Sequence, residues 1–168
     1  MTDLDIVAVF TRCFHRSHAT QLVGGAAEPL YQPAEAEHET HRLYYRENFA
    51  ASALHETAHW CVAGSARRTQ VDFGYVYIEP PRTPAAQAAF FAAELKVQGL
   101  EALFCAAAGL EFVPSADQIG VDLNEFRQPL AEHRSQVRQW MHNSSDQRAH
   151  QFEQALRRAC SPRRSAVG

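Results

Sequence analysis

Residues 51–63 read ASALHETAHWCVA, and this stretch predicts a helix on which two histidines share one face. Alanine and leucine favour helices, neither glycine nor proline interrupts the run, and Gly64 follows as a stop signal. We therefore expect a helix from Phe49 to Ala63. Within it, His55 and His59 are four residues apart, so their side chains project from the same face, one turn above the other.

Hydrophobic spacing predicts further helices on both sides of this stretch, and two short runs predict strands. Apolar residues recur every three or four positions in Leu4–Phe14, residues 85–110 with an interruption near Gly99, residues 128–142 and residues 145–159. The β-branched and aromatic runs are Leu43–Tyr45 and residues 71–78, while residues 28–42, with two prolines, predict an ordered loop. The fold class that follows is α+β, a helix-rich single domain with a small β-sheet and an H-E-x-x-H helix.

The composition of the 168 residues, 46% hydrophobic and 21% charged, is that of a globular protein. We expect one domain over residues 1–160 and a flexible tail over residues 161–168. The net charge of −3 argues against nucleic-acid binding, and no apolar run approaches the ~18 residues of a membrane span. The first ten residues carry two aspartates where a signal peptide carries basic residues, so we expect a cytoplasmic protein. Without a CxxC pair, the cysteines are expected to be free thiols: Cys13, Cys61, Cys105 and Cys160.

The sequence His55-Glu56-Thr57-Ala58-His59 matches the H-E-x-x-H pattern of metal sites. Two imidazoles one helical turn apart can bind one metal ion without strain in the backbone. The alternative is an ordinary helix with two partly exposed histidines and a surface glutamate. The apolar residues 60–63 favour the metal site, because histidines in a core need polar partners.

A third ligand has to come from another segment, and Glu94 is the first candidate. On a helical wheel Glu94 lies on an apolar face with Phe90 and Val97, where an unpaired carboxylate would cost several kcal/mol and a cation would remove that cost. Glu101 lies on the same face seven residues later, so the wheel leaves the choice between the two open. Glu111, in a loop, is a weaker candidate. A salt bridge to an arginine remains the alternative for either glutamate.

The metal decides the reaction, and the residues alone leave two reactions open. Zinc would activate a water with Glu56 as the general base and give a peptidase. Ferrous iron would leave positions for dioxygen and give an oxygenase. The chain is small for a protease, and Val62 and Ser65 stand where the longer protease motif has glycine and a third histidine.

Several further motifs occur together and in order between Thr20 and Gly109: E-P-x-Y-x-P, A-E-H, A-S-A-L-H-E, H-W-C, A-R-R and V-D-F-G-Y. In this combination the sequence closely resembles the bacterial elongation factor P hydroxylases. It departs from the family pattern E-V-K-P-Q at residues 94–98, which read E-L-K-V-Q with Val97 in place of the proline. The spacing of Glu94 and Gln98 is unchanged.

The resemblance implies a metal-dependent oxygenase that hydroxylates the lysylated lysine of elongation factor P. It implies Fe(II) held by His55, His59 and Glu94, with dioxygen as cosubstrate, and elongation factor P as the partner. Glu56 would then have a structural or electrostatic role, because hydroxylation needs no activated water. A 2-oxoacid requirement and the oligomeric state stay open, with a monomer favoured.

The amine-bearing substrate implied by the resemblance predicts carboxylates and aromatic rings in its pocket. The candidates for substrate binding are Glu37, Tyr44, Asp72 and Tyr75; for the acidic loop around Glu37, a solvated run of charges is the alternative. The second ring nitrogen of each histidine needs a hydrogen-bond partner. Glu56 is the first candidate, and Asp72 and Glu101 are the others. Arg67 and Arg68 are candidates for docking the partner or for capping the preceding helix.

Overall fold

The computed structural model describes residues 1–71, 83–115 and 123–161, with the backbone alone at 123–126. Its helices are α1 (Asp3–His18), α2 (Ala50–Val62), α3 (Pro84–Ala108), α4 (Leu123–Asn143) and α5 (Arg148–Cys160), with a 3-10 turn η1 (Arg67–Thr69). The strands are β1 (Thr20–Ala26), β2 (Leu30–Gln32) and β3 (His41–Arg46). The predicted fold class, a helix-rich α+β domain with a small sheet, is confirmed.

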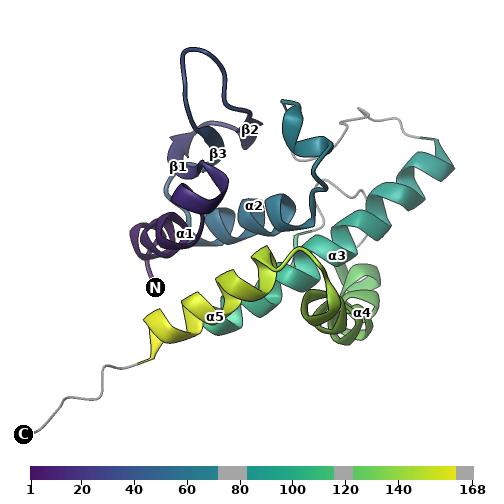
Figure 1. Cartoon of the computed structure of the whole chain (residues 1–168). Helices are drawn as coiled ribbons and strands as arrows, with labels where there is room; N and C mark the ends of the chain where they lie inside the picture. The colour runs from purple at the N-terminus through teal and green to yellow at the C-terminus, as the bar shows by residue number, and fades with distance from the viewer. Residues whose placement is uncertain (72–82, 116–122, 162–168) are drawn as a thin grey trace, which may run out of the picture.

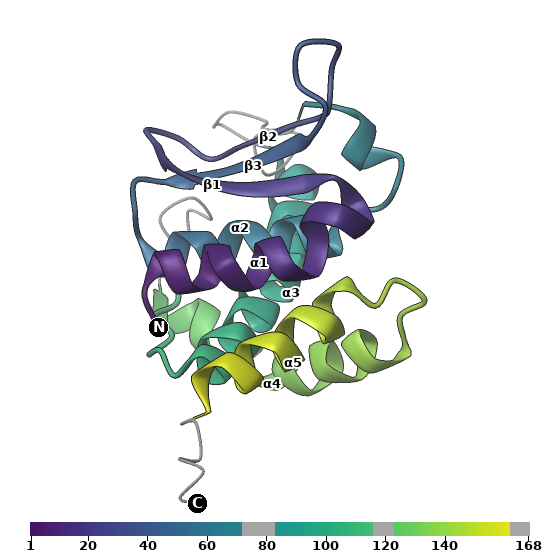
Figure 2. The same cartoon turned by 60° about the vertical axis from the view of Figure 1, so that its left-hand side comes forward.

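Helix α3 lies at the centre of the helical part of the molecule. It packs against α2 on one side and against α4 and α5 on the others, while the sheet covers α1 and α2 (Figures 1 and 2). The interface between α2 and α3 is therefore inside the molecule, between the sheet layer and the C-terminal helices.

The sheet has the order β1-β3-β2, with β3 in the middle, parallel to β1 and antiparallel to β2. Leu43 and Tyr45 of β3 are buried, with exposed fractions of 3% and 1%. Because side chains alternate between the two faces of a strand, Tyr44 lies on the face opposite to them. The buried face packs on the helices, since β3 contacts α2.

Local sequence sets the ends of the helices. Thr2 and Asp5 form a capping box at the start of α1. Thr83 accepts a hydrogen bond from the backbone of Ala86 at the start of α3, and Gly109 ends that helix with a φ of 68°. These signals lie in the sequence, and each α-helix of the described residues has a counterpart among the predicted ones.

The predicted interruption of the third helix near Gly99 is wrong, because α3 is continuous through this position. A Cβ atom on Gly99 would lie 3.0 Å from Cγ2 of Val137 in α4. Glycine therefore serves the close approach of two helices here and does not break the helix.

The strand predictions fared less well than those for the helices. Strand β3 confirms the short run Leu43–Tyr45, but residues 28–42 are not simply a loop, because they contain β2 and the start of β3. Strand β1 was not predicted at all. The strand predicted at 71–78 lies outside the described residues except for Val71, as does the predicted tail beyond Ser161.

Two composition-based expectations can be compared with the described residues. All four cysteines are free thiols. Among the helices of the described ranges, none combines the length and the apolar character required to cross a bilayer.

Candidate metal centre

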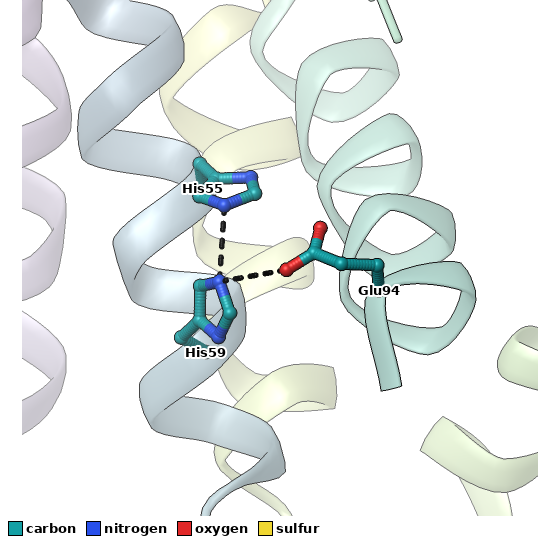
Figure 3. Close-up of side chains that lie close together, drawn as sticks. All are labelled: His55, His59 and Glu94. Carbon is teal, nitrogen blue, oxygen red and sulfur yellow. Dashed lines mark hydrogen bonds and ion pairs between the residues drawn. The ribbon is translucent and has the colours of Figure 1, made fainter. Parts of the chain in front are cut away.

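Helices α2 and α3 bring together two histidines and one carboxylate. His55 and His59 project from α2, and Glu94 projects toward them from α3 (Figure 3). The Nε2 atoms of the histidines lie 3.0 Å apart, and Oε1 of Glu94 lies 3.6 Å from Nε2 of His59. One ligand atom from each residue lies within 4.8 Å of the others, so these three side chains could hold a metal ion.

Two of the three separations between the donor atoms match those around a single divalent ion. Ligands at about 2.1 Å from one ion lie about 3.0 Å apart at a right angle and about 3.4 Å apart in a tetrahedron. The observed 3.0 Å between nitrogens and 3.6 Å between nitrogen and oxygen are close to these values. Two histidines and one carboxylate are a donor set found with zinc and with non-haem iron.

Glu101 fixes the orientation of His55. Its Oε2 lies 2.8 Å from Nδ1 of the imidazole, on the side of the ring away from His59. Burial lowers the pKa of His55, but the hydrogen bond and charge of Glu101 outweigh burial and raise that pKa to about 9. Glu101 thereby holds the Nδ1 proton and directs Nε2 toward the other two side chains, and a metal ion would have to displace the second proton, which the raised pKa keeps on Nε2.

Gln98 holds the carboxylate of Glu94 through the oxygen that does not face His59. Its Nε2 donates to Oε2 of Glu94 at 2.9 Å, and its amide exchanges two hydrogen bonds with the backbone of Ser115, at 2.7 and 3.0 Å. Glu94 is only 4% exposed. Burial raises the pKa of this carboxyl, against the charge of His55 and the bond from Gln98, so a bound cation would relieve the cost of the buried charge.

The neutral form of His59 is favoured, as a metal ligand requires. Burial lowers its pKa well below the ordinary value, and the positive charges of His55 and Arg67 lower it further. A neutral imidazole offers its lone pair without first losing a proton.

A narrow cavity, part of it open to solvent, adjoins His59. Glu56, which is 6% exposed, lies in its wall. Among the described residues, those that line it are Tyr31, Leu43, Glu56, His59, Trp60, Ala63, Arg67 and Arg68. Arg68 donates to the carbonyl of Ala63 at 2.7 Å, which is the capping role considered for it.

Comparison with known proteins identifies the family. Residues 9–166 match the sequence model of the family described as elongation factor P hydroxylase. The chain belongs to this family. It is 39% identical over 155 residues to the elongation factor P lysine hydroxylase of Haemophilus influenzae, an alignment that covers 90% of this chain and 85% of that protein.

In this member of the elongation factor P hydroxylase family, the predicted site residues fall into three groups. His55, His59 and Glu94 converge, and Glu101 contacts the far nitrogen of His55. Asp72 and Tyr75 lie outside the described residues.

The third group, Glu37 and Tyr44, lies away from the residues that converge. Glu37 is exposed in the loop between β2 and β3, and the Tyr44 hydroxyl accepts a bond from Arg42 on the outer face of the sheet, at 3.4 Å. Neither residue lines the cavity beside His59. A role for these two in substrate binding stays a prediction.

The sequence-based prediction did not include Gln98 as a partner of Glu94, although the spacing of four residues between them indicates a contact. Residues four apart on a helix lie on the same face, and glutamine at that distance can donate to a carboxylate. The partner of that glutamine, Ser115, has no comparable signal, because it lies 17 residues away beyond the end of α3.

Proposed function

We propose that this protein is an iron-dependent oxygenase that hydroxylates the lysylated lysine of elongation factor P. The observation that carries the proposal is the convergence of His55, His59 and Glu94 in a member of the elongation factor P hydroxylase family. The name of the Haemophilus influenzae relative, a lysine hydroxylase of elongation factor P, supports the choice of substrate. We place the reaction in the cytoplasm, which the free thiols support.

In this proposal the three converging side chains are the metal ligands, and their neighbours hold them in place. Fe(II), if bound by these three side chains, would keep coordination positions open for dioxygen. One oxygen atom would enter a C–H bond of the lysine side chain, and the other would be reduced to water with two electrons from an external reductant. Glu101 keeps the His55 proton on Nδ1, and Gln98 orients the Glu94 carboxylate. Glu56 contributes a buried negative charge beside His59 and needs to move no proton.

The cavity beside His59 is the proposed entrance for the substrate side chain. The lysylated side chain is long and carries ammonium groups, which aromatic faces and carboxylates attract. The wall of the cavity offers the ring of Tyr31 and the carboxylate of Glu56, which lie beside the positive charges of Arg67 and Arg68. We retain Asp72 and Tyr75 as proposed substrate contacts, together with Glu37 and Tyr44 for the protein surface around the modified residue.

A zinc peptidase is the second candidate, and one observation favours it. Glu56 is buried in the cavity wall next to His59, where the general base of an H-E-x-x-H peptidase would act on a water. Family membership favours the oxygenase. The two functions differ in the metal they need and in their demand for oxygen.

The deciding experiment measures the intact mass of lysylated elongation factor P after incubation with the iron-loaded protein, dioxygen and an added reductant such as ascorbate. We expect a gain of one oxygen atom, dependent on dioxygen and absent with the Glu94→Ala variant. The zinc-loaded protein is the matched control and should give no gain. Cleavage of peptides by the zinc form, with no change in mass of the factor under any condition, would replace the proposal with the peptidase.

A further inference from the structure

A buried arginine at the start of α5 caps the C-terminal end of α2. Arg148, only 2% exposed, donates to the carbonyl oxygens of Trp60, Cys61 and Ala63 at 2.7, 3.3 and 2.8 Å. The last carbonyls of a helix have no partner within the helix, so an outside donor is needed when the end is buried. The start of α5 lies beside this end of α2 (Figure 1).

The guanidinium group of Arg148 is itself held in one position. Asp146 accepts bonds from its Nε at 2.8 and 2.9 Å and forms an ion pair with its Nη2 at 2.7 Å. The group also lies 4.3 Å from the centre of the Trp60 ring. Three carbonyls and one carboxylate require a planar fork of donors, which arginine has and lysine lacks.

A second arginine supports the same end of the helix. Arg68 donates to the Ala63 carbonyl at 2.7 Å and lies 3.5 Å from the Asp146 carboxylate. Two positive charges therefore face the negative end of the α2 dipole, an arrangement that stabilises the last turn.

His59 belongs to this last turn. Its carbonyl accepts the backbone N–H of Ala63 at 2.9 Å, and Arg148 binds the carbonyls of the two residues that follow His59. Terminal turns of helices fray when their carbonyls lack partners. If this turn opened, the His59 imidazole would leave its position 3.0 Å from His55 and 3.6 Å from Glu94.

We propose that Arg148 is a positioning residue for the metal centre, which closes the end of α2 and so keeps the imidazole of His59 within reach of Glu94. The inference rests on the proposed function, because it requires His55, His59 and Glu94 to be the metal ligands. It links the C-terminal helix to the metal centre through the backbone of the helix that carries the histidines.

The test titrates the metal-free full-length protein with Co(II) and monitors binding by the visible absorption of the Co(II) complex. The temperature is kept below the unfolding transition of every variant. We expect Arg148→Met, which removes all donors, to weaken Co(II) binding at least tenfold. Arg148→Lys keeps the charge and can replace only part of the carbonyl contacts, so its affinity should lie between those of Arg148→Met and the wild type.

Two variants on α5 serve as controls. Leu156→Ala empties a fully buried core position on the same helix and matches the loss of stability. Arg158→Ala removes one exposed positive charge and matches the loss of charge. Both should bind Co(II) within about twofold of the wild type, because neither change reaches the end of α2.

The outcomes separate this inference from the proposed function. A wild type that binds no Co(II), or a Glu94→Ala variant that binds it equally well, overturns the metal centre itself. A wild type that needs Glu94, with Arg148→Met and Arg148→Lys both binding as tightly as the wild type, overturns the role of Arg148 alone. Equal weakening in Leu156→Ala also overturns it, since affinity would then follow global stability. If Arg148→Met does not fold, Arg148→Lys decides, and wild-type affinity in that variant overturns the inference.

Discussion

At the scale of single residues, Glu94 and Glu101 show how neighbouring atoms give two buried carboxylates different tasks. Both lie on the face of α3 that meets α2, and their exposed fractions of 4% and 6% are nearly equal. Glu94 reaches toward the Nε2 side of the histidines, whereas Glu101 binds Nδ1 of His55. Position relative to the two imidazole nitrogens therefore distinguishes a candidate ligand from a residue that orients one.

These two positions predict a graded response to substitution. Glu94→Ala should abolish iron binding, because two histidines alone make a weak site. Glu101→Gln keeps the size of the side chain but weakens the hydrogen bond to Nδ1 of His55. We therefore expect metal affinity to fall about tenfold to hundredfold. Bound iron per chain and Co(II) affinity measure both effects. Full loss in Glu101→Gln with retention in Glu94→Ala would exchange the two roles.

At the scale of elements, the sequence is sufficient to predict a helix or strand where the pattern that specifies it is local. Helix α2, predicted from Phe49 to Ala63, and the apolar runs of α1 and α3 could be predicted because the period of a helix and its end signals lie within a few residues. Strand β1 was not predicted because its sequence, TQLVGGA, contains two glycines, which are rare in strands. Its partner β3 also lies some twenty residues later in the chain, with Thr20 paired to His41. Pairing between distant segments leaves little trace in either segment alone.

The candidate site shows the same limit at the level of side chains. The helical wheel placed Glu94 and Glu101 on the correct face, since the face follows from the period alone. It could not say which imidazole nitrogen each carboxylate meets, because that depends on how α3 is placed along α2. Gln98 lies on the same face. It was missed because its side chain is neutral, so its burial does not call for a charged partner or a metal ion.

Gly99 offers a prediction about the packing of α3 on α4. Substitution by alanine should favour the isolated helix but push against Val137, whose Cγ2 would lie 3.0 Å from the new Cβ. We expect Gly99→Ala to destabilise the protein by about 1 kcal/mol, since tight overpacking outweighs the gain in helix propensity. Urea unfolding measures the change.

A double-mutant cycle with Val137→Ala tests the cause. The smaller side chain makes room for the new methyl group, so Gly99→Ala should cost less in the Val137→Ala background, with a coupling of at least about 0.5 kcal/mol. Strict additivity of the two substitutions would mean that the contact between α3 and α4 does not explain the glycine.

At the scale of the whole molecule, a polar network joins segments that are far apart in the chain. Arg148 reaches the end of α2 from a position 88 residues later than Trp60, and Arg68 contacts both that end and Asp146. The Tyr31 hydroxyl of β2 donates to the Arg68 carbonyl at 3.0 Å, which adds the sheet. No sequence pattern marks Arg148 among the other arginines of the C-terminal helices, because its role depends on tertiary contacts.

This network predicts a contribution to stability that depends on pH. Burial raises the pKa of Asp146, but the hydrogen bonds and charge of Arg148, with the charge of Arg68, outweigh burial and leave that pKa below its usual value. A carboxyl whose pKa is lower in the folded than in the unfolded state stabilises the fold above its unfolded pKa of about 3.9. That contribution is lost as the pH falls through the folded value.

The difference in unfolding free energy between the wild type and Asp146→Asn isolates this contribution. It should be positive and constant from neutral pH down to about pH 5, then shrink below about pH 4 as the wild-type carboxylate takes up its proton. Glu28→Gln, an exposed carboxylate in the turn before β2, is the matched control and should leave the free energy of unfolding nearly unchanged across the range. Urea unfolding at each pH measures all three proteins. A difference that stays constant to the acid end, or grows there, would mean that the ion pair with Arg148 does not stabilise the folded chain, and that the arginine is held by the helix carbonyls alone.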